Sequence, residues 1–345
     1  MTVEVRAPSR PGVAGLVIAA AGALLLFVAP DVLLIGFAGL LFALFLRGGA
    51  DGIGRLTGLA VGWNLLLFLL LILGGFVLVG VFAAPVVSEQ VDQLMERLPR
   101  SVAALRQRLE GQAWSRSLLE QVKPERLLSA GGAIAGPATS AVAATFGALG
   151  NLAIIFTLGL FLAADLDTYR KGVRALFPPA QRPRVDSVLK ELGDVLRGWL
   201  LAQFSSMAVI GVLTATGLWL LGIPLIVALG LLAALLTFIP NLGPILAAAP
   251  AILLALADSP ISALWVTLLY IGVQVIEGNV TTPLIQQRTI AIPPALTIAM
   301  QLLMAVLFGL LGLALAVPLL AVAMTLIRLL YVEGYLERRT LPEAG

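Results

Sequence analysis

Long apolar runs constrain this chain more than any other feature. A membrane-spanning helix needs about 20 consecutive apolar residues, and several runs approach or exceed that length. Clear runs cover residues 12–29, 32–46, 59–84, 137–164, 199–221 and 261–282, and two longer tracts cover 224–257 and 294–332. Hydrophobic residues make up 60% of the chain and charged residues only 12%, which excludes a water-soluble fold. The sequence therefore predicts an all-α integral membrane protein with about eight membrane segments.

Basic residues between the runs predict the topology, because Lys and Arg are enriched in cytoplasmic loops. They occur before the first run, after the second run, throughout residues 165–198, after residue 282 and at the C-terminal end. The turns at 30–31, 222–224 and 257–260 contain none. Both termini are thus expected in the cytoplasm. The Arg-, Ala- and Gly-rich composition is typical of a GC-rich bacterial genome, so the expected location is a bacterial cytoplasmic (inner) membrane.

The two longer tracts fit this alternation only if each enters and leaves the membrane on one side. Pro240 to Pro244 would divide the tract 224–257 into halves of about 15 residues, too short for a straight span. Gly309, Gly312 and Pro318 interrupt the tract 294–328. Paired broken segments of opposite orientation are typical of a transporter's binding site at mid-membrane. The alternative is that each tract forms two ordinary short spans.

Two hydrophilic stretches have helical periodicity and suggest three units. Residues 1–84 would form an N-terminal scaffold of three spans, and 136–345 a C-terminal transport core. Between them, residues 85–135 carry Val91, Leu94 and Leu98 on one helical face, which predicts an extracytoplasmic amphipathic helix. That helix could lie on the membrane, pack on the spans or pair with copies of itself. A second amphipathic helix, 184–198, is expected in the cytoplasm, leading into the next span.

The residues that most enzymes need are missing. The chain has no Cys and no His, which removes thiol nucleophiles, imidazole bases and the usual zinc ligands. It also lacks a Gly-rich phosphate loop ending in Gly-Lys-Ser or Gly-Lys-Thr. The net charge of +3 is not gathered into one segment, so no nucleic-acid partner is expected. We predict neither enzymatic activity nor a cofactor or metal.

An acidic residue at membrane depth is the first candidate for function. Between residues 198 and 332 the only carboxylates are Asp258, in a turn, and Glu277, near the end of a span. Such an acid is costly to ionise without a partner and often marks an ion or proton pathway. Polar or helix-ending residues surround it: Gln274, Asn279, Thr281, Thr282, Pro283 and Arg288. The alternative is that Glu277 lies at the cytoplasmic interface, ionised and paired with Arg288.

The interruption of the first tract is the second candidate. Pro240, Gly243 and Pro244 would free backbone groups at depth, which only protein or a water-filled cavity can satisfy. Asn241 adds an amide, and a half-helix beginning near Gly243 would favour an anionic or oxygen-rich solute. The alternative is a tight turn at the membrane surface. Gly309 and Gly312 form the corresponding interruption of the second tract.

Several motifs of the C-terminal half occur together in a fixed order. They are Leu196-Arg197-Gly198, Gly217 to Pro224, Ile239 to Pro244, Glu277-Gly278-Asn279 with Pro283, Leu307 to Gly312, and Ala316-Val317-Pro318. This series resembles the autoinducer-2 exporter family, also called PerM-like permeases. Three positions depart from the family pattern. Asn241-Leu242 replaces a frequent Tyr-Val, Pro293-Pro294 replaces a His-Pro pair, and Trp199 replaces a frequent Gln.

This resemblance implies a secondary transporter that exports a small polar solute by alternating access, with autoinducer-2 the model solute. It also implies a homo-oligomer, with pentamers among the expected states, embedded in a lipid bilayer. The missing histidine removes a His-based proton relay. Two alternatives stay open: a sodium/proton antiporter that moves Na⁺ and H⁺, and an oligomeric membrane scaffold that transports nothing.

Overall fold

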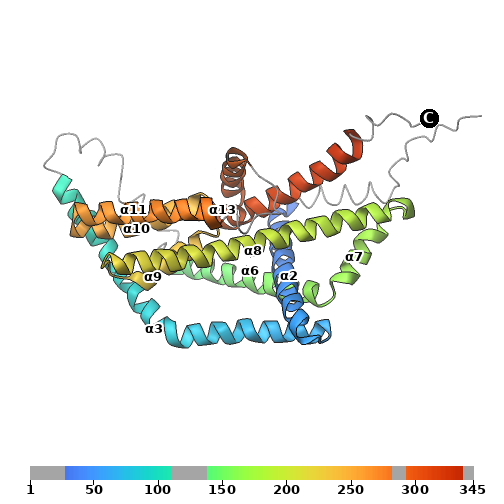
Figure 1. The fold of residues 1–345 in the computed structure, drawn as a ribbon, viewed down its shortest axis with the longest axis horizontal. Helices are drawn as coiled ribbons and strands as arrows, with labels where there is room; N and C mark the ends of the chain where they lie inside the picture. The colour runs from blue at the N-terminus through green and yellow to red at the C-terminus, as the bar shows by residue number, and fades with distance from the viewer. Residues whose placement is uncertain (1–27, 110–137, 282–292, 337–345) are drawn as a thin grey trace, which may run out of the picture.

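The computed structural model describes residues 28–109, 138–281 and 293–336, and the regular elements in these ranges are all helical (Figure 1). The predicted all-α fold is confirmed. The elements are α2 (Pro30–Thr57), α3 (Val61–Leu109), α6 (Ala138–Ala164), α7 (Leu166–Ala175), η1 (Pro179–Gln181), α8 (Arg182–Leu220), α9 (Ile226–Leu236), α10 (Leu242–Asp258), α11 (Pro260–Ile276), η2 (Glu277–Thr281), α13 (Pro294–Leu326) and η3 (Ile327–Leu336).

Five of the described helical segments are long and apolar enough to cross a membrane. A sixth is added if α6 and α7, which bend by 84° at Asp165, count as one span. The short apolar helices α9 and α10 come in addition. The expected first span, 12–29, lies almost wholly outside the described residues. The predicted multi-spanning class is therefore confirmed, while the number of crossings depends on how α6, α7, α9 and α10 meet the bilayer.

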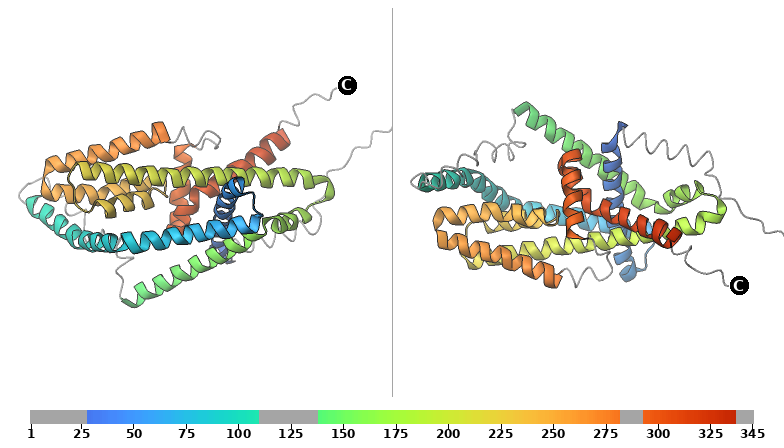
Figure 2. Two further views of the ribbon diagram at one scale, coloured as in Figure 1. Left: turned by 60° about the horizontal axis from the view of Figure 1, so that its bottom comes forward. Right: turned by 90° about the horizontal axis from the view of Figure 1, so that it is seen from above.

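The helices run in two directions. The N-terminal part of α3 and the helices α8, α10 and α11 follow the long axis of the molecule (Figure 1). By contrast, α2 and the first part of α13 run across that axis in every view (Figure 2). Seen from above, the transverse part of α13 meets α8 near its middle, at the end of the α9–α10–α11 group (Figure 2).

Small residues allow two helix pairs to approach closely. The helices α2 and α6 meet at Gly39 and Gly159. A Cβ added at Gly39 would lie 3.0 Å from Leu158 Cβ, and a Cβ added at Gly159 would lie 3.0 Å from the Gly39 carbonyl oxygen. The pair α8 and α9 uses Gly211 and Gly230 in the same way. Each glycine is followed four residues later by alanine, a spacing that favours close helix packing in membranes.

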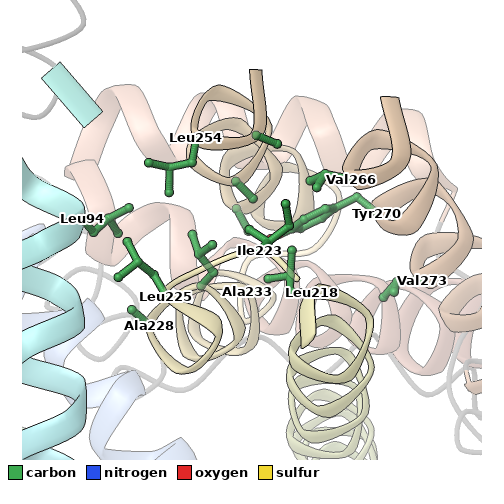
Figure 3. Close-up of a cluster of buried hydrophobic side chains, with 14 of the residues drawn as sticks. Leu94, Leu218, Ile223, Leu225, Ala228, Ala233, Leu254, Val266, Tyr270 and Val273 are labelled. Atoms are coloured by element: carbon green, nitrogen blue, oxygen red, sulfur yellow. The ribbon is translucent and has the colours of Figure 1, made fainter. Parts of the chain in front are cut away.

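A buried apolar cluster joins α3, α8, α9, α10 and α11 (Figure 3). Leu94 of α3 faces Leu225, Ala228 and Leu254 there, and Val91 and Leu98 pack against the same cluster. Of the three roles considered for the amphipathic segment, packing on other helices is therefore what Val91, Leu94 and Leu98 do. The segment to residue 109 continues α3 without a break, and 110–135 lie outside the described residues.

The charges that the sequence assigned to one side of the membrane meet at one end of the helices. Asp51, after the second apolar run, lies 3.6 Å from Arg197, which lies just before the apolar run 199–221. Arg328 lies 2.8 Å from Glu191 in the N-terminal part of α8. That part and the following span form one continuous helix, as the sequence predicted.

Candidate transport site

The tract 224–257 forms a helical hairpin. It consists of α9 with 11 residues and α10 with 17, lengths of about 17 and 26 Å at 1.5 Å per residue, both below the ~30 Å of a bilayer core. The residues that precede α9 and those at the C-terminal end of α10 line the same cavity of about 470 Å³, Gly222 and Pro224 from the first group and Ala257 and Asp258 from the second. The two ends of the tract therefore lie together, as a hairpin requires, and the predicted interruption at residues 240–244 covers the end of the turn between the helices and the start of α10.

The backbone at the tip of the hairpin is sharply turned. Asn241 has a positive φ of 66°, and α10 begins immediately after it. Gly243 is buried, and a Cβ at this position would overlap the carbonyl oxygen of Leu236. Only glycine fits there. The Asn241 side chain is exposed and makes no hydrogen bond with the described residues, so its amide is open to a solute.

Two glutamines from other helices bind the carbonyl groups at this tip. Gln203 of α8 donates to the Thr237 carbonyl at 2.6 Å, and Gln301 of α13 donates to the Pro240 carbonyl at 2.7 Å. A helix end at membrane depth leaves carbonyls without intrahelical partners, and an unsatisfied one is costly in an apolar environment. The two side chains therefore hold the hairpin tip between α8 and α13.

Gln301 has a second feature relevant to binding. Its side chain is fully buried, yet its Oε1 atom has no hydrogen-bond partner among the residues that the structure describes. Buried polar atoms nearly always have a partner, so an unpaired acceptor next to a hairpin tip needs an explanation. A hydroxyl or amine of a small solute, or a water molecule, could donate to it.

Glu277 lies where α11 gives way to the π-helical turn η2. Its carboxylate accepts hydrogen bonds from Gln274 at 3.1 Å and from Ser206 of α8 at 3.4 Å. The side chain is half-buried. Asn279, in contrast, is exposed and donates back to the Val275 carbonyl of its own helix at 2.9 Å.

One face of α8 connects the two candidate regions. Gln203 and Ser206 are one helical turn apart, and both are more than nine-tenths buried. Gln203 binds the hairpin tip, and Ser206 binds Glu277. Thr237 at the hairpin tip and the candidate acid Glu277 are thus held by adjacent turns of the same helix.

The second interruption is also confirmed. Gly309 has φ 60° and ψ −142° inside α13, a conformation that breaks the helix into two parts. Gly312 is buried and has no room for a Cβ beside the Met304 carbonyl. Phe308, which precedes the break, packs in the same apolar cluster as Phe238 of the hairpin tip and Trp199 of α8. The two interruptions therefore share one packed region.

The structure places most of the predicted site residues within this region. Pro240, Gly243, Pro244, Gln274, Glu277, Gly309 and Gly312 fall at the hairpin tip, the end of α11 or the break in α13. Thr282, Pro283 and Arg288 lie outside the described residues, so the pairing of Glu277 with Arg288 is not tested. Gln203, Ser206 and Gln301 were not predicted. Their only sequence signal is that they are uncharged polar residues within apolar stretches of their helices.

Comparison with known proteins identifies relatives and a family for this chain. Relatives include "Putative transport protein YueF" of Bacillus subtilis, 28% identical over 75% of this chain and 74% of the relative. "Putative transport protein MT0215" of Mycobacterium tuberculosis is 28% identical over 72% of this chain and 70% of its own length. "Putative transport protein YrrI" of Bacillus subtilis is 30% identical over 48% and 47%. The family model described as AI-2E family transporter matches residues 16–331, so this chain belongs to the AI-2E family of membrane transporters.

Proposed function

We propose that this transporter exports a small polar solute of the autoinducer-2 type across the bacterial inner membrane. The observation that carries the proposal is Gln301, whose Nε2 binds the hairpin tip while its buried Oε1 is left unpaired. A solute rich in hydroxyl groups could donate to Oε1 and accept from the free amide of Asn241. Family membership supports a transport role, and the chemistry of these groups favours a neutral or oxygen-rich cargo.

The transport step we propose is alternating access. In this hypothesis the α9–α10 hairpin is re-entrant and moves relative to α8, while the break at Gly309 lets the two parts of α13 move separately. Short helices joined at non-helical residues can change their relative angle without unwinding. Movement of the hairpin would reach Glu277 through Gln203 and Ser206 on one face of α8. Protonation of Glu277 would then couple transport to an ion gradient.

Efflux from reconstituted vesicles tests the cargo. Vesicles loaded with autoinducer-2 should lose it faster with the protein than without it, and Gln301→Met should slow this efflux about tenfold by removing both amide contacts. Gln93→Met is the matched control, because Gln93 bonds only to Glu89 on the same helix. Efflux that is no faster with the protein than without it would refute the proposed cargo.

Glu277 favours a second candidate function, sodium/proton antiport. Imposing a sodium gradient on vesicles without organic solute should then move protons, detected with a pH-sensitive dye, and Glu277→Gln should abolish the signal. Glu96→Gln is the control, since Glu96 is exposed and pairs only with Arg100. Solute efflux without sodium-driven proton movement would support export. If the protein stays oligomeric and shows neither solute efflux nor sodium-driven proton movement, the result would support the scaffold hypothesis.

A further inference from the structure

The C-terminal end of α2 is hollow on one side. Its last turns contain four glycines, Gly48, Gly49, Gly52 and Gly54, between Arg47 and Arg55. A Cβ added at Gly48 or at Gly52 would meet nothing within 4 Å. Gly48, Gly49 and Gly52 form part of the wall of a cavity of about 390 Å³ that lies between α2, α3 and α8, apart from the proposed transport site.

The inner wall of this cavity is apolar and aromatic. Phe45 lies at its centre, with its ring centroid 5.6 Å from that of Phe68 on α3 and 4.9 Å from that of Phe204 on α8. Leu201, which also lines the cavity, is 68% exposed. The cavity therefore opens toward the side of the helices that faces lipid.

Arginines form the rim. Arg55 and Arg197 line the cavity together with Asp51, and Arg47 lies 4.0 Å from the same Asp51. Arg55 and Arg197 on the rim, with Arg47 beside it, thus outnumber the Asp51 carboxylate. The Nη1 atom of Arg197 pairs with Asp51 at 3.6 Å, and its buried Nε atom has no hydrogen-bond partner among the described residues. The rim therefore has surplus positive charge.

We propose that this cavity binds a phospholipid with an anionic headgroup. The phosphate would lie between Arg55 and Arg197, whose guanidinium groups match its geometry, and an acyl chain would pack against Phe45, Phe68 and Phe204. A soluble anion would leave the aromatic wall without a partner, and a neutral lipid would leave the surplus positive charge uncompensated. The loop charges place this end in the cytoplasmic leaflet, where anionic lipids bind basic pockets between helices.

Binding of defined lipids to the purified, delipidated full-length chain tests the proposal. Native mass spectrometry and thermal unfolding would compare phosphatidylglycerol with phosphatidylcholine of the same acyl chains. Phosphatidylglycerol should bind more tightly and raise the unfolding temperature more. Arg55→Gln combined with Arg197→Gln should weaken its binding about tenfold, since hydrogen bonds to charged groups are lost. Lys190→Gln, an exposed cation on the same helix as Arg197, should not.

A second variant tests the cavity itself without removing a charge. Gly52→Leu places a side chain in open space inside the cavity and should displace the acyl chain. Gly36→Leu is the matched control, because Gly36 is also on α2, also has nothing within 4 Å, and does not line the cavity. Equal binding of the two lipids, or unchanged phosphatidylglycerol binding in Gly52→Leu, would overturn the proposal. Displacement of the lipid by inorganic phosphate alone would indicate a soluble-anion site and would also overturn it.

Discussion

At the scale of single residues, the fold depends on amide side chains buried in apolar helices. Gln203 and Gln301 each satisfy one carbonyl of the hairpin tip. Replacing either with leucine removes the donor and leaves a buried carbonyl unpaired, which costs about 1–3 kcal/mol. We expect Gln203→Leu and Gln301→Leu each to lower the thermal unfolding temperature in detergent. Gln93→Leu, on the largely exposed side of α3, should leave it unchanged, and equal stability of all three variants would contradict this role.

The same residues show what the sequence could and could not predict about the site. The helix interruptions at Pro240, Gly243 and Gly309 were predictable, because proline restricts the backbone at its own position and glycine gives it more freedom. The role of Gln301 depends on a contact with a carbonyl 61 residues away, and no local pattern encodes that contact. Glu277 was found because an acid is rare at membrane depth. A glutamine in an apolar helix is a weaker signal, since it is uncharged and less costly to bury.

At the scale of helices, α9 begins without a capping side chain of its own. Its N-cap residue, Leu225, has a positive φ of 64° and provides no side-chain acceptor. Gln90 of α3 supplies one instead, because its Oε1 accepts hydrogen bonds from the amides of Val227 and Ala228, both at 3.0 Å. The amphipathic part of α3 therefore stabilises the start of the hairpin as well as covering its apolar face.

Gln90→Leu should fray the first turn of α9. Loss of a capping acceptor costs about 1 kcal/mol, and hydrogen exchange of the Val227 and Ala228 amides should rise accordingly. Gln93→Leu, three residues along the same helix, is the control. Unchanged exchange in Gln90→Leu would show that the contact does not stabilise the helix start.

The bend between α6 and α7 has a charged cap. Asp165 accepts hydrogen bonds from the Thr168 hydroxyl at 2.6 Å and from the Thr168 amide at 3.2 Å. These bonds hold the pKa of the Asp165 carboxyl below its ordinary value of 3.8. Because the folded pKa is the lower one, the contribution to stability is complete above pH 3.8 and is lost as the pH falls through the folded pKa.

We therefore expect Asp165→Ala to increase hydrogen exchange in residues 166–175 at neutral pH. In the unmodified protein, protection of this segment, corrected for intrinsic exchange rates, should fall only below pH 3.8. Asp167→Ala should have the smaller effect, because Asp167 has no side-chain hydrogen bond among the described residues. Protection that declines at a higher pH would assign the transition to another group.

Helix positions were easier to predict than helix boundaries. The spacing of apolar residues predicted that the amphipathic helix 184–198 continues into the span 199–221, because the same helical repeat runs through both parts. The structure has one helix there, α8. A unit beginning at residue 85 was expected because the composition turns polar there. The structure continues α3 through Pro85 to Leu109, since Val91, Leu94 and Leu98 pack on the hairpin and support further helix.

At the scale of the whole molecule, the transverse helices show why counting apolar runs does not give the topology. An apolar run specifies that a helix is surrounded by lipid or by other apolar side chains, and it says nothing about its direction. The apolar run in α2 satisfies the length rule, and the first part of α13 is also apolar, yet both helices lie across the axis that α8 and α11 follow (Figure 2). The loop charges carry independent information, and two ion pairs, Asp51 with Arg197 and Glu191 with Arg328, join segments that these loop charges assign to the same side.

The absence of cysteine allows a direct test of the proposed re-entrant hairpin, because single cysteines can be introduced into an otherwise unreactive chain. Leu221→Cys and Asp258→Cys flank the hairpin and line one cavity, so both should react with a membrane-impermeant maleimide added outside intact cells. Leu56→Cys, at the opposite end and 89% exposed, should react only after the membrane is opened. Asn241→Cys should react poorly with the bulky reagent and more readily with a small one that enters the membrane. If Asn241→Cys instead reacts with the impermeant maleimide only after the membrane is opened, as Leu56→Cys should, α9 and α10 cross the bilayer as separate spans, and the mid-membrane site proposed at Gln301 loses its basis.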